Sequence, residues 1–320
     1  TMLAQDRIAD AQRQMTYYAY LQRQRLQRAA ALSAELAELQ RVETQIIEKR
    51  TALDAARVRQ LELALERLRS TPLLQGPRMI VVNIPEFVLR AYEVQGERIV
   101  VRAQMKVIVG QALDTRTPLI GEDLRRIEFK PYWNVPASIA RKELVPRLER
   151  EPAYWERESF EFVGAGGVDA LLTNDKLQAV LDGRLRIRQR PGPRNALGDI
   201  KFVFPNRESI YLHHTPSVGL FERARRDFSH GCIRVEQPLA LAAFALHDNS
   251  DWSEARIAAA MTQREPSTVT LASPVPVLIA YGTALVTGGR LHFFEDIYGH
   301  DRALDAALRH AKARSKQAGV

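Results

Sequence analysis

The first 71 residues contain neither glycine nor proline, and the chain changes character after them. Without helix breakers, and with leucines recurring at helical spacing, this segment predicts long amphipathic helix. The leucines that define the spacing are Leu32, Leu36, Leu39, Leu61, Leu65 and Leu68. The chain therefore divides into at least two parts, a helical arm over residues 1–74 and a different fold after it.

The arm is expected to bend rather than run as one rod. The sequence TALD, Thr51 to Asp54, resembles a capping box, in which a Thr side chain and an acidic residue three positions later begin a new helix. No strict heptad persists along the segment, which favours a hairpin packed on the main domain over a coiled coil that binds a partner.

After Pro72 the sequence becomes rich in β-branched residues. The runs RMIVVNI, FVLRAYEV and RIVVRAQMKVIVG, separated by Pro85 and Gly96, predict a strand meander. Further strands are expected at IKFVFP, SIYLHH, STVTL, PVPVLIAYGTALVT and RLHFF, and helices at EQPLALAAFALHD and RALDAALRHAKAR. This order predicts an α+β fold with a mostly antiparallel β core and helices at its edges.

A long irregular stretch interrupts the strands. Residues 117–200 combine proline, glycine and arginine with aromatic residues, which is typical of an insertion that lies over a surface as a lid. We therefore expect a main domain over 75–300 with this insertion, followed by a C-terminal helix and tail over 301–320.

The composition restricts the function classes only weakly. The 320 residues are 46% hydrophobic, enough for a sizeable core, and no apolar run has the length of a membrane span. The net charge of +8 is compatible with a solvated surface or an acidic polymer as partner, and no nucleic-acid-binding motif accompanies it. The opening TMLAQDRIADAQRQM has no apolar core of a signal peptide.

The segment YLHHTPSVGLFERARRDFSHGCIRVEQP holds three of the seven histidines and the single cysteine, Cys232. One cysteine excludes an internal disulfide, and the dispersed histidines suggest no metal site. His213 ends a strand-like run 19 positions before Cys232, so a loop could bring thiol and imidazole together. A cysteine nucleophile needs such a base, and Gly231 permits a tight turn that aims amides at an oxyanion.

From the residues alone, a buried structural cysteine remains the more common explanation for Cys232. If Cys232 is catalytic, two histidines compete for the role of base. Strand alternation puts Tyr211 and His213 on one face and His214 on the other, which favours His213.

The motif SHGCIRV, with a histidine upstream, resembles the signature of YkuD-type L,D-transpeptidases. An ordered series resembles the YcbB-like subgroup in particular, over roughly Arg78 to His300. Its members are VVNIPEFVLRAYE, VIVG, Thr117-Pro118, FKPYWNVPASIARKEL, RQRPGPRNALGDIKFVFPN, YLHHTPSVGLF and FSHGCIRVEQPLALA. The resemblance implies a capping subdomain over Pro131 to Arg194.

The resemblance also implies roles for individual residues. Cys232 would form a thioester with a peptidoglycan stem at diaminopimelate and release D-alanine, with His213 as base. Tyr211 and the amides of Gly231 and Cys232 would stabilise the oxyanion, while His230 and Arg234 would shape the pocket. Trp133, Asn134, Arg194 and Ser229 are candidates for substrate binding. No metal or cofactor is implied.

Two features depart from the subgroup's pattern. His214 stands where an aspartate is common, although the contact that orients the catalytic histidine is generally a backbone carbonyl. The helical arm stands where relatives carry a globular peptidoglycan-binding domain, so substrate placement is open.

The function implied is a periplasmic, cell-envelope acyltransferase with ping-pong kinetics. It would form 3–3 or 1–3 cross-links in wall remodelling and be acylated by carbapenem-type β-lactams. The same thioester could instead serve an L,D-carboxypeptidase or a transpeptidase that attaches lipoproteins. Outside enzymes, a wall-bound scaffold that uses the helical arm is the alternative. The sequence does not fix the acceptor amine or the oligomeric state.

Overall fold

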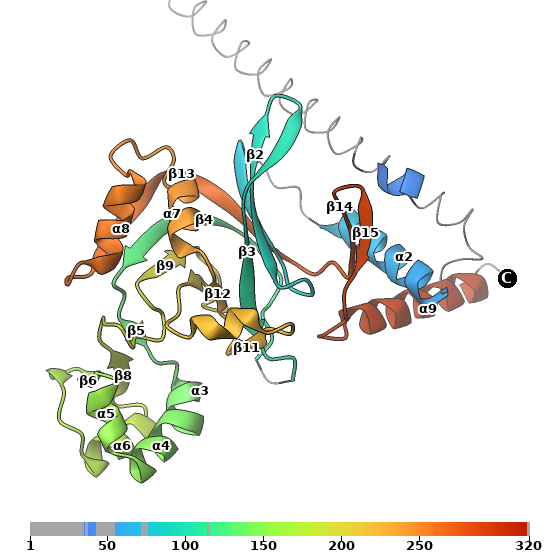
Figure 1. The fold of residues 1–320 in the computed structure, drawn as a ribbon. Helices are drawn as coiled ribbons and strands as arrows, with labels where there is room; N and C mark the ends of the chain where they lie inside the picture. The colour runs from blue at the N-terminus through green and yellow to red at the C-terminus, as the bar shows by residue number, and fades with distance from the viewer. Residues whose placement is uncertain (1–34, 36–37, 43–54, 72–75, 114, 319–320) are drawn as a thin grey trace, which may run out of the picture. The chain divides into compact units, whose positions relative to one another are not determined.

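The computed structural model describes residues 35, 38–42, 55–71, 76–113 and 115–318. The chain forms two compact units, each with contributions from distant parts of the sequence (Figure 1). The larger unit consists of residues 72–93 and 101–281, and the smaller one of residues 1–71, 94–100 and 282–320. The capping sequence TALD and most of the predicted first helix of the arm lie outside the described residues.

The larger unit is built on a mixed, mostly antiparallel sheet, as predicted. Among the described residues it has nine strands in the order β11-β3-β12-β10-β9-β4-β13-β1-β2, and β3 also pairs with β2, so the sheet closes on itself. The strands are β1 (Arg78–Asn83), β2 (Val88–Gln95), β3 (Arg98–Gly110), β4 (Ile120–Phe129), β9 (Ile200–Val203), β10 (Leu212–His213), β11 (Asp227–Ser229), β12 (Ile233–Val235) and β13 (Ser267–Ala280).

Alternation places the apolar side chains of these strands inside the closed sheet. Val82, Leu89, Ile127, Leu212 and Ile233 come from five different strands, and each has no exposed surface. Burial of such side chains is the main term that holds strands of distant sequence together. The core therefore fixes β10 and β12 as neighbouring strands of the sheet.

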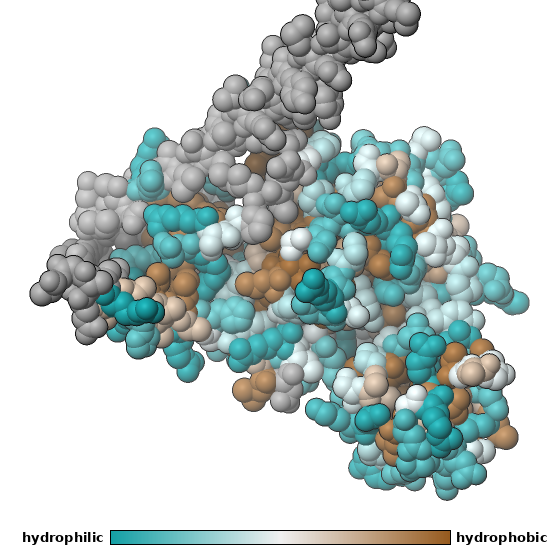
Figure 2. Space-filling view, turned by 180° about the vertical axis from the view of Figure 1, so that it is seen from behind, coloured by the Kyte–Doolittle hydropathy of each residue, from teal (hydrophilic) through white to brown (hydrophobic). Residues whose placement is uncertain are grey.

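The inserted segment forms a lobe with its own sheet and core, which we call the lid (Figure 1). Its strands have the order β5-β8-β6-β7. The lid comprises β5 (Trp133–Asn134), α3 (Ala137–Ile139), the π-helix η1 (Ala140–Leu144), α4 (Val145–Arg150), α5 (Ala153–Arg157), β6 (Phe160–Gly164), β7 (Gly167–Asp169), α6 (Asn174–Leu181) and β8 (Arg186–Gln189). In the space-filling view the lid lobe is mostly hydrophilic with separate apolar patches (Figure 2).

The predicted lower limit of the insertion, Thr117, is wrong. Residues 120–129 are not irregular but form β4, which pairs with β13 and β9 in the main sheet. Leu124, Ile127 and Phe129 are fully buried on one side of this strand. The charged residues between them obscured a strand that is polar on its other face.

The remaining elements of the larger unit are helical: η2 (Val218–Glu222), α7 (Pro238–Ala245) and α8 (Glu254–Thr262). The prediction of α7 with Pro238 in its first turn is confirmed. Helix α8 was not predicted, although Ser253 caps it by accepting a hydrogen bond from the Arg256 amide at 3.3 Å.

The smaller unit joins the described end of the arm to the C-terminus. It contains α2 (Ala55–Ser70), the hairpin of β14 (Ala284–Thr287) and β15 (Arg290–Phe293), and α9 (His300–Ala318). Leu61 and Leu65 of α2 pack with Ala284, and Arg59 pairs with Asp305 at 2.6 Å. Residues 282–300, predicted as part of the main domain, therefore cluster with α2, because the hairpin buries its apolar face against that helix.

Among the described helices, none is long and apolar enough to cross a membrane.

Candidate functional site

Adjacent strands bring the thiol and the imidazole side by side. Strands β10 and β12 are parallel neighbours, with Leu212 opposite Ile233 and His213 opposite Arg234. The Ile233 amide donates to the Tyr211 carbonyl at 3.1 Å, which places Cys232 next to Tyr211. The rings of Tyr211 and His213 then meet edge to face, 5.7 Å apart. Leu212 between them is fully buried in the core.

These side chains line one cavity of about 230 Å³ within the larger unit. One wall comes from the sheet and the loop before β12, and the other from the lid. The lining residues are Trp133, Pro136, Ile139, Glu143, Leu144, Arg147, Tyr154, Phe160, Ala196, Leu197, Tyr211, His213, Ser229, His230, Cys232 and Arg234. The cavity is mostly apolar, with polar groups gathered at the Cys232 side, as is usual for small-molecule sites.

The tautomer of His213 follows from its backbone contact. Its Nδ1 lies 2.5 Å from the His214 carbonyl oxygen, which can only accept, so Nδ1 carries the proton. Nε2 is then the free acceptor. Burial, with a smaller contribution from Arg234, lowers the pKa of His213 to about 3, so the ring is neutral at physiological pH.

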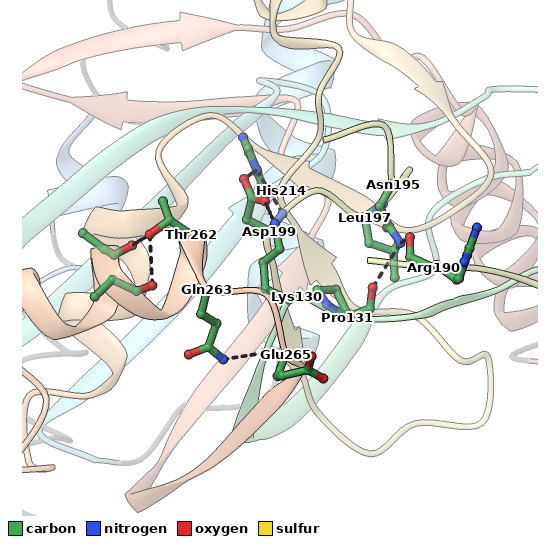
Figure 3. A network of polar contacts seen from close by, with 12 residues as sticks. Lys130, Pro131, Arg190, Asn195, Leu197, Asp199, His214, Thr262, Gln263 and Glu265 are labelled. Carbon is green, nitrogen blue, oxygen red and sulfur yellow. Dashed lines mark hydrogen bonds and ion pairs between the residues drawn. The ribbon is translucent and has the colours of Figure 1, made fainter. Parts of the chain in front are cut away.

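His214 points away from this cavity into a separate polar cluster (Figure 3). Its Nδ1 lies 3.4 Å from Asp199 Oδ2, and Lys130 Nζ lies 2.7 Å from the other oxygen of the same carboxylate. The hydrogen bond to His214, with Lys130, holds the pKa of Asp199 below its usual value. Gly198 makes room for the imidazole, because a Cβ there would lie 2.5 Å from Nδ1. His214 is therefore held in this cluster while its carbonyl oxygen contacts His213 Nδ1.

The loop before Cys232 is held by a chain of hydrogen bonds. Ser229 Oγ accepts from the Gly231 amide at 3.1 Å and donates to the Cys232 carbonyl at 2.5 Å. The buried Thr117 hydroxyl donates to the Gly231 carbonyl at 2.8 Å. Gly231 has φ +112°, a conformation that favours glycine. Because its amide donates to Ser229 Oγ, Gly231 supports the turn.

Burial sets the resting state of the thiol and the phenol. It raises the pKa of Cys232, and contacts with the Tyr211 backbone and side chain, Lys201 and Arg234 offset only part of this shift. Burial also raises the pKa of Tyr211, whose hydroxyl stays protonated. The site therefore rests as neutral thiol, neutral imidazole and neutral phenol, and a thiolate has to be generated by proton transfer.

Two permanent cations, Lys201 and Arg234, lie opposite His213 in the strand register, and Arg234 also lines the cavity. Its Nε is buried without a hydrogen-bond partner, and burial lowers its pKa. A buried guanidinium nitrogen without a hydrogen-bond partner is energetically costly.

Seven of the ten predicted site residues line the cavity: Trp133, Tyr211, His213, Ser229, His230, Cys232 and Arg234. Gly231 lies behind it in the turn. Asn134 and Arg194 do not line the cavity. Asn134 is exposed beside Arg188 in the lid sheet, and Arg194 donates to the Arg157 carbonyl at 2.8 Å. Asn134 lies on the lid and Arg194 just after it, and in both places sequence position gives no direction to a side chain.

Sequence reasoning missed the lid residues Glu143, Arg147 and Tyr154. Glu143 Oε1 lies 2.8 Å from His230 Nε2, and Arg147 stacks 3.5 Å above the Tyr154 ring. The short π-helix and α-helices that contain these residues have no sequence pattern that indicates a cavity wall.

A thiol and a neutral imidazole in one apolar cavity, beside a donor-rich turn, define a candidate site for a cysteine nucleophile. Residues 77–277 match the YkuD family, the L,D-transpeptidase catalytic domain. The chain belongs to this family.

One curated protein is similar in sequence to most of this chain. A Haemophilus influenzae protein named "Putative L,D-transpeptidase" is 31% identical over 259 residues, which cover 80% of this chain and 51% of that protein. The chain thus spans about half the length of this curated relative.

Two solved structures are also similar. One is that of Bd1075 from Bdellovibrio bacteriovorus, 14% identical with a TM-score of 0.28, covering 74% of this chain and 56% of that one. The other is a mutant of the helical cell shape determining protein Pgp2 from Campylobacter jejuni, 12% identical with a TM-score of 0.24, covering 74% and 55%.

Proposed function

We propose that the protein is a periplasmic L,D-transpeptidase of peptidoglycan, of the YcbB-like subgroup, in which Cys232 is the nucleophile. The observation that supports this most directly is the tautomer of His213. Because Nδ1–H is held by the His214 carbonyl, Nε2 is free to accept the proton of a thiol in the same cavity. Family membership supplies the substrate class.

In the first half-reaction, Cys232 Sγ bonds to the diaminopimelate carbonyl carbon while its proton passes to His213 Nε2. The bond to D-alanine then breaks, and the same proton goes to the leaving amine. The Tyr211 hydroxyl and the Cys232 amide would stabilise the oxyanion; one such donor is typically worth about 10²–10³-fold in rate.

In the second half-reaction, an amine of another stem attacks the thioester. The new amide bond forms as the carbon–sulfur bond breaks, and a proton of the amine returns to the thiolate through His213. The product is a 3–3 or a 1–3 cross-link, according to the acceptor. Because donor and acceptor react in turn, the kinetics are ping-pong.

Incubation with muropeptides that carry tetrapeptide stems tests the proposal. We expect a cross-linked dimer and free D-alanine, both abolished in Cys232→Ala, and a carbapenem adduct on Cys232 by intact-mass spectrometry. Tripeptide without dimer would instead identify a carboxypeptidase. Attachment to a lysine side chain would identify a lipoprotein-attaching enzyme, and the absence of any turnover would favour a scaffold.

A pair of histidine variants tests the assignment of the base. His213→Ala should slow acylation by about 10²–10⁴-fold, the usual contribution of a general base. His214→Ala keeps the backbone carbonyl that orients His213, so acylation should remain within a few fold of the unaltered protein. The reverse order of effects would contradict the assignment.

A further inference from the structure

We propose that Glu143 on the lid binds the acceptor as a primary ammonium group, so that the second substrate is selected by charge before it reaches the thioester. The inference rests on the proposed function and deepens it, because it assigns to the acceptor a binding residue on the opposite wall from Cys232.

Glu143 reaches the cavity because of the local helix geometry. It lies in the five-residue π-helix η1, Ala140–Leu144, whose wider turn changes the angular spacing of side chains. Ala140 and Leu144 are buried in the lid, while Glu143 lines the cavity. The π-helix thus presents a carboxylate at a wall whose other members are largely apolar.

The carboxylate is held in place and yet has capacity for a ligand. Its Oε1 lies 2.8 Å from His230 Nε2, two positions before Cys232 in the chain. The part of the chain that the structure describes gives its Oε2 no hydrogen bond, and the Glu143 side chain is 54% exposed. An ionised carboxylate can accept several hydrogen bonds, so an ammonium can join His230 on it without displacing the imidazole.

Charge around the cavity makes this position distinctive. Glu143 is the single carboxylate among the residues that line the cavity, and Arg147 and Arg234 are the permanent cations. An ammonium is repelled by both arginines and attracted to Glu143 alone. Arg147 is already occupied, since it stacks on Tyr154 and lies 3.5 Å from Glu151.

The walls beside Glu143 fit the rest of an amino-acid side chain. Trp133, Ile139, Leu144 and Phe160 provide an apolar surface that suits the methylene arm of a diamino acid. The cavity of about 230 Å³ is at the small end for a ligand site, so it holds such an arm rather than two complete stems.

The acceptor amine can arrive as a charged ammonium, and every proton in the reaction is still accounted for. The ammonium first gives one proton to solvent as it leaves Glu143, which yields the neutral amine. That amine forms the bond to the thioester carbon, the carbon–sulfur bond breaks, and a second proton passes through His213 to the Cys232 thiolate. Glu143 is therefore a binding residue that acts before the bond forms.

The test measures how the thioester partitions between amine and water. Unaltered protein and Glu143→Gln are incubated with an isotopically labelled tetrapeptide donor and increasing unlabelled diaminopimelate-containing tripeptide, and the ratio of labelled dimer to labelled tripeptide, the hydrolysed donor, is measured. Both products arise from one thioester, so their ratio does not depend on how fast it forms. Loss of a charged hydrogen bond should lower the ratio for Glu143→Gln by about ten- to hundredfold.

Two controls separate charge recognition from general damage. Glu149→Gln removes an exposed carboxylate of the same lid that does not line the cavity, and it should leave the ratio unchanged. Hydroxylamine, which is largely uncharged at neutral pH, should trap the thioester equally well in Glu143→Gln and in the unaltered protein.

Four results would overturn the inference. An unchanged dimer ratio in Glu143→Gln, or an equal loss with hydroxylamine, would overturn it while the proposed function stands. Hydrolysed donor alone at every acceptor concentration would also overturn it. If the unaltered protein releases no D-alanine at all, the proposed function fails together with the inference.

Discussion

At the scale of single residues, the site combines a thiol and an imidazole that are both kept neutral by burial. The shifts act in opposite directions: burial raises the pKa of Cys232 and lowers that of His213. A thiolate–imidazolium pair at rest is thereby disfavoured. In the proposed mechanism the His213 ring would act as a base once a substrate carbonyl is in place, and until then the neutral thiol would react slowly with other electrophiles.

This electrostatic state predicts the pH dependence of alkylation. Since burial raises the pKa of Cys232, a smaller fraction is thiolate at any given pH than for a free thiol, whose ordinary value is 9.0. The rate of reaction with iodoacetamide in the native protein should therefore rise with a midpoint above pH 9.0. The same protein unfolded in urea should show the ordinary midpoint. A native midpoint below the unfolded one would indicate a preformed ion pair instead.

At the scale of elements, a buried amide side chain links the two segments that connect the lid to the main sheet. Asn195 is 1% exposed, and its Nδ2 donates at 3.0 Å to the carbonyls of Pro131, where the chain enters the lid, and Arg190, where it leaves (Figure 3). Its Oδ1 accepts from the Leu197 amide at 2.8 Å. One side chain thus ties the two connecting segments together.

Asn195→Ala should loosen this link measurably. The substitution leaves buried backbone groups unpaired, each at a cost of about 1–3 kcal/mol, so we expect a drop of about 2 kcal/mol in the local free energy of opening. Hydrogen exchange of the amides in residues 186–197 measures this free energy of opening. Asn134→Ala, on an exposed strand of the same lid, is the matched control. Equal exchange in both variants would contradict the role of Asn195.

Some elements of the structure could be predicted from the sequence and others could not. The strand pattern around Ile80, Val107 and Ile200 was regular enough to predict the β core, but strand β12 around Ile233 was not predicted. The spacing of His213 and Cys232 allowed the pair, and the resemblance to the YkuD family favoured it over a structural cysteine. Glu143 and Tyr154 were not predictable, because a short helix in an insertion has no periodicity that identifies its inward face. Strand β4 was missed because its outer face is so highly charged that it resembles a loop.

At the scale of the whole molecule, residues at opposite ends of the sequence share a unit. The helix α2 packs on the β14–β15 hairpin, and Gln60 donates at 2.9 and 2.7 Å to the carbonyls of Thr283 and Phe294. The described end of the arm is therefore part of a folded unit and not a free extension.

Leu65→Ala tests the integrity of this unit. Leu65 is 6% exposed, and truncation of a buried leucine costs about 2 kcal/mol at the lower end of the usual range. The amides of α2 should then exchange roughly 30-fold faster, if they exchange through opening of this unit. Leu68→Ala, on the same helix but 44% exposed, is the control and should have little effect. Similar exchange in the two variants would contradict the packing.

The closure of the main sheet has a consequence for how the protein acquires its native state. Strand β3 pairs with both β11 and β12, so residues 107–110 meet residues 227–235 across more than a hundred positions of sequence. Such non-local pairings form slowly during refolding. The surroundings of Cys232 form only when these strands have paired. The rate at which a covalent probe specific for the native site labels Cys232 would therefore report the last step of folding. This labelling should develop later than the circular dichroism signal of secondary structure.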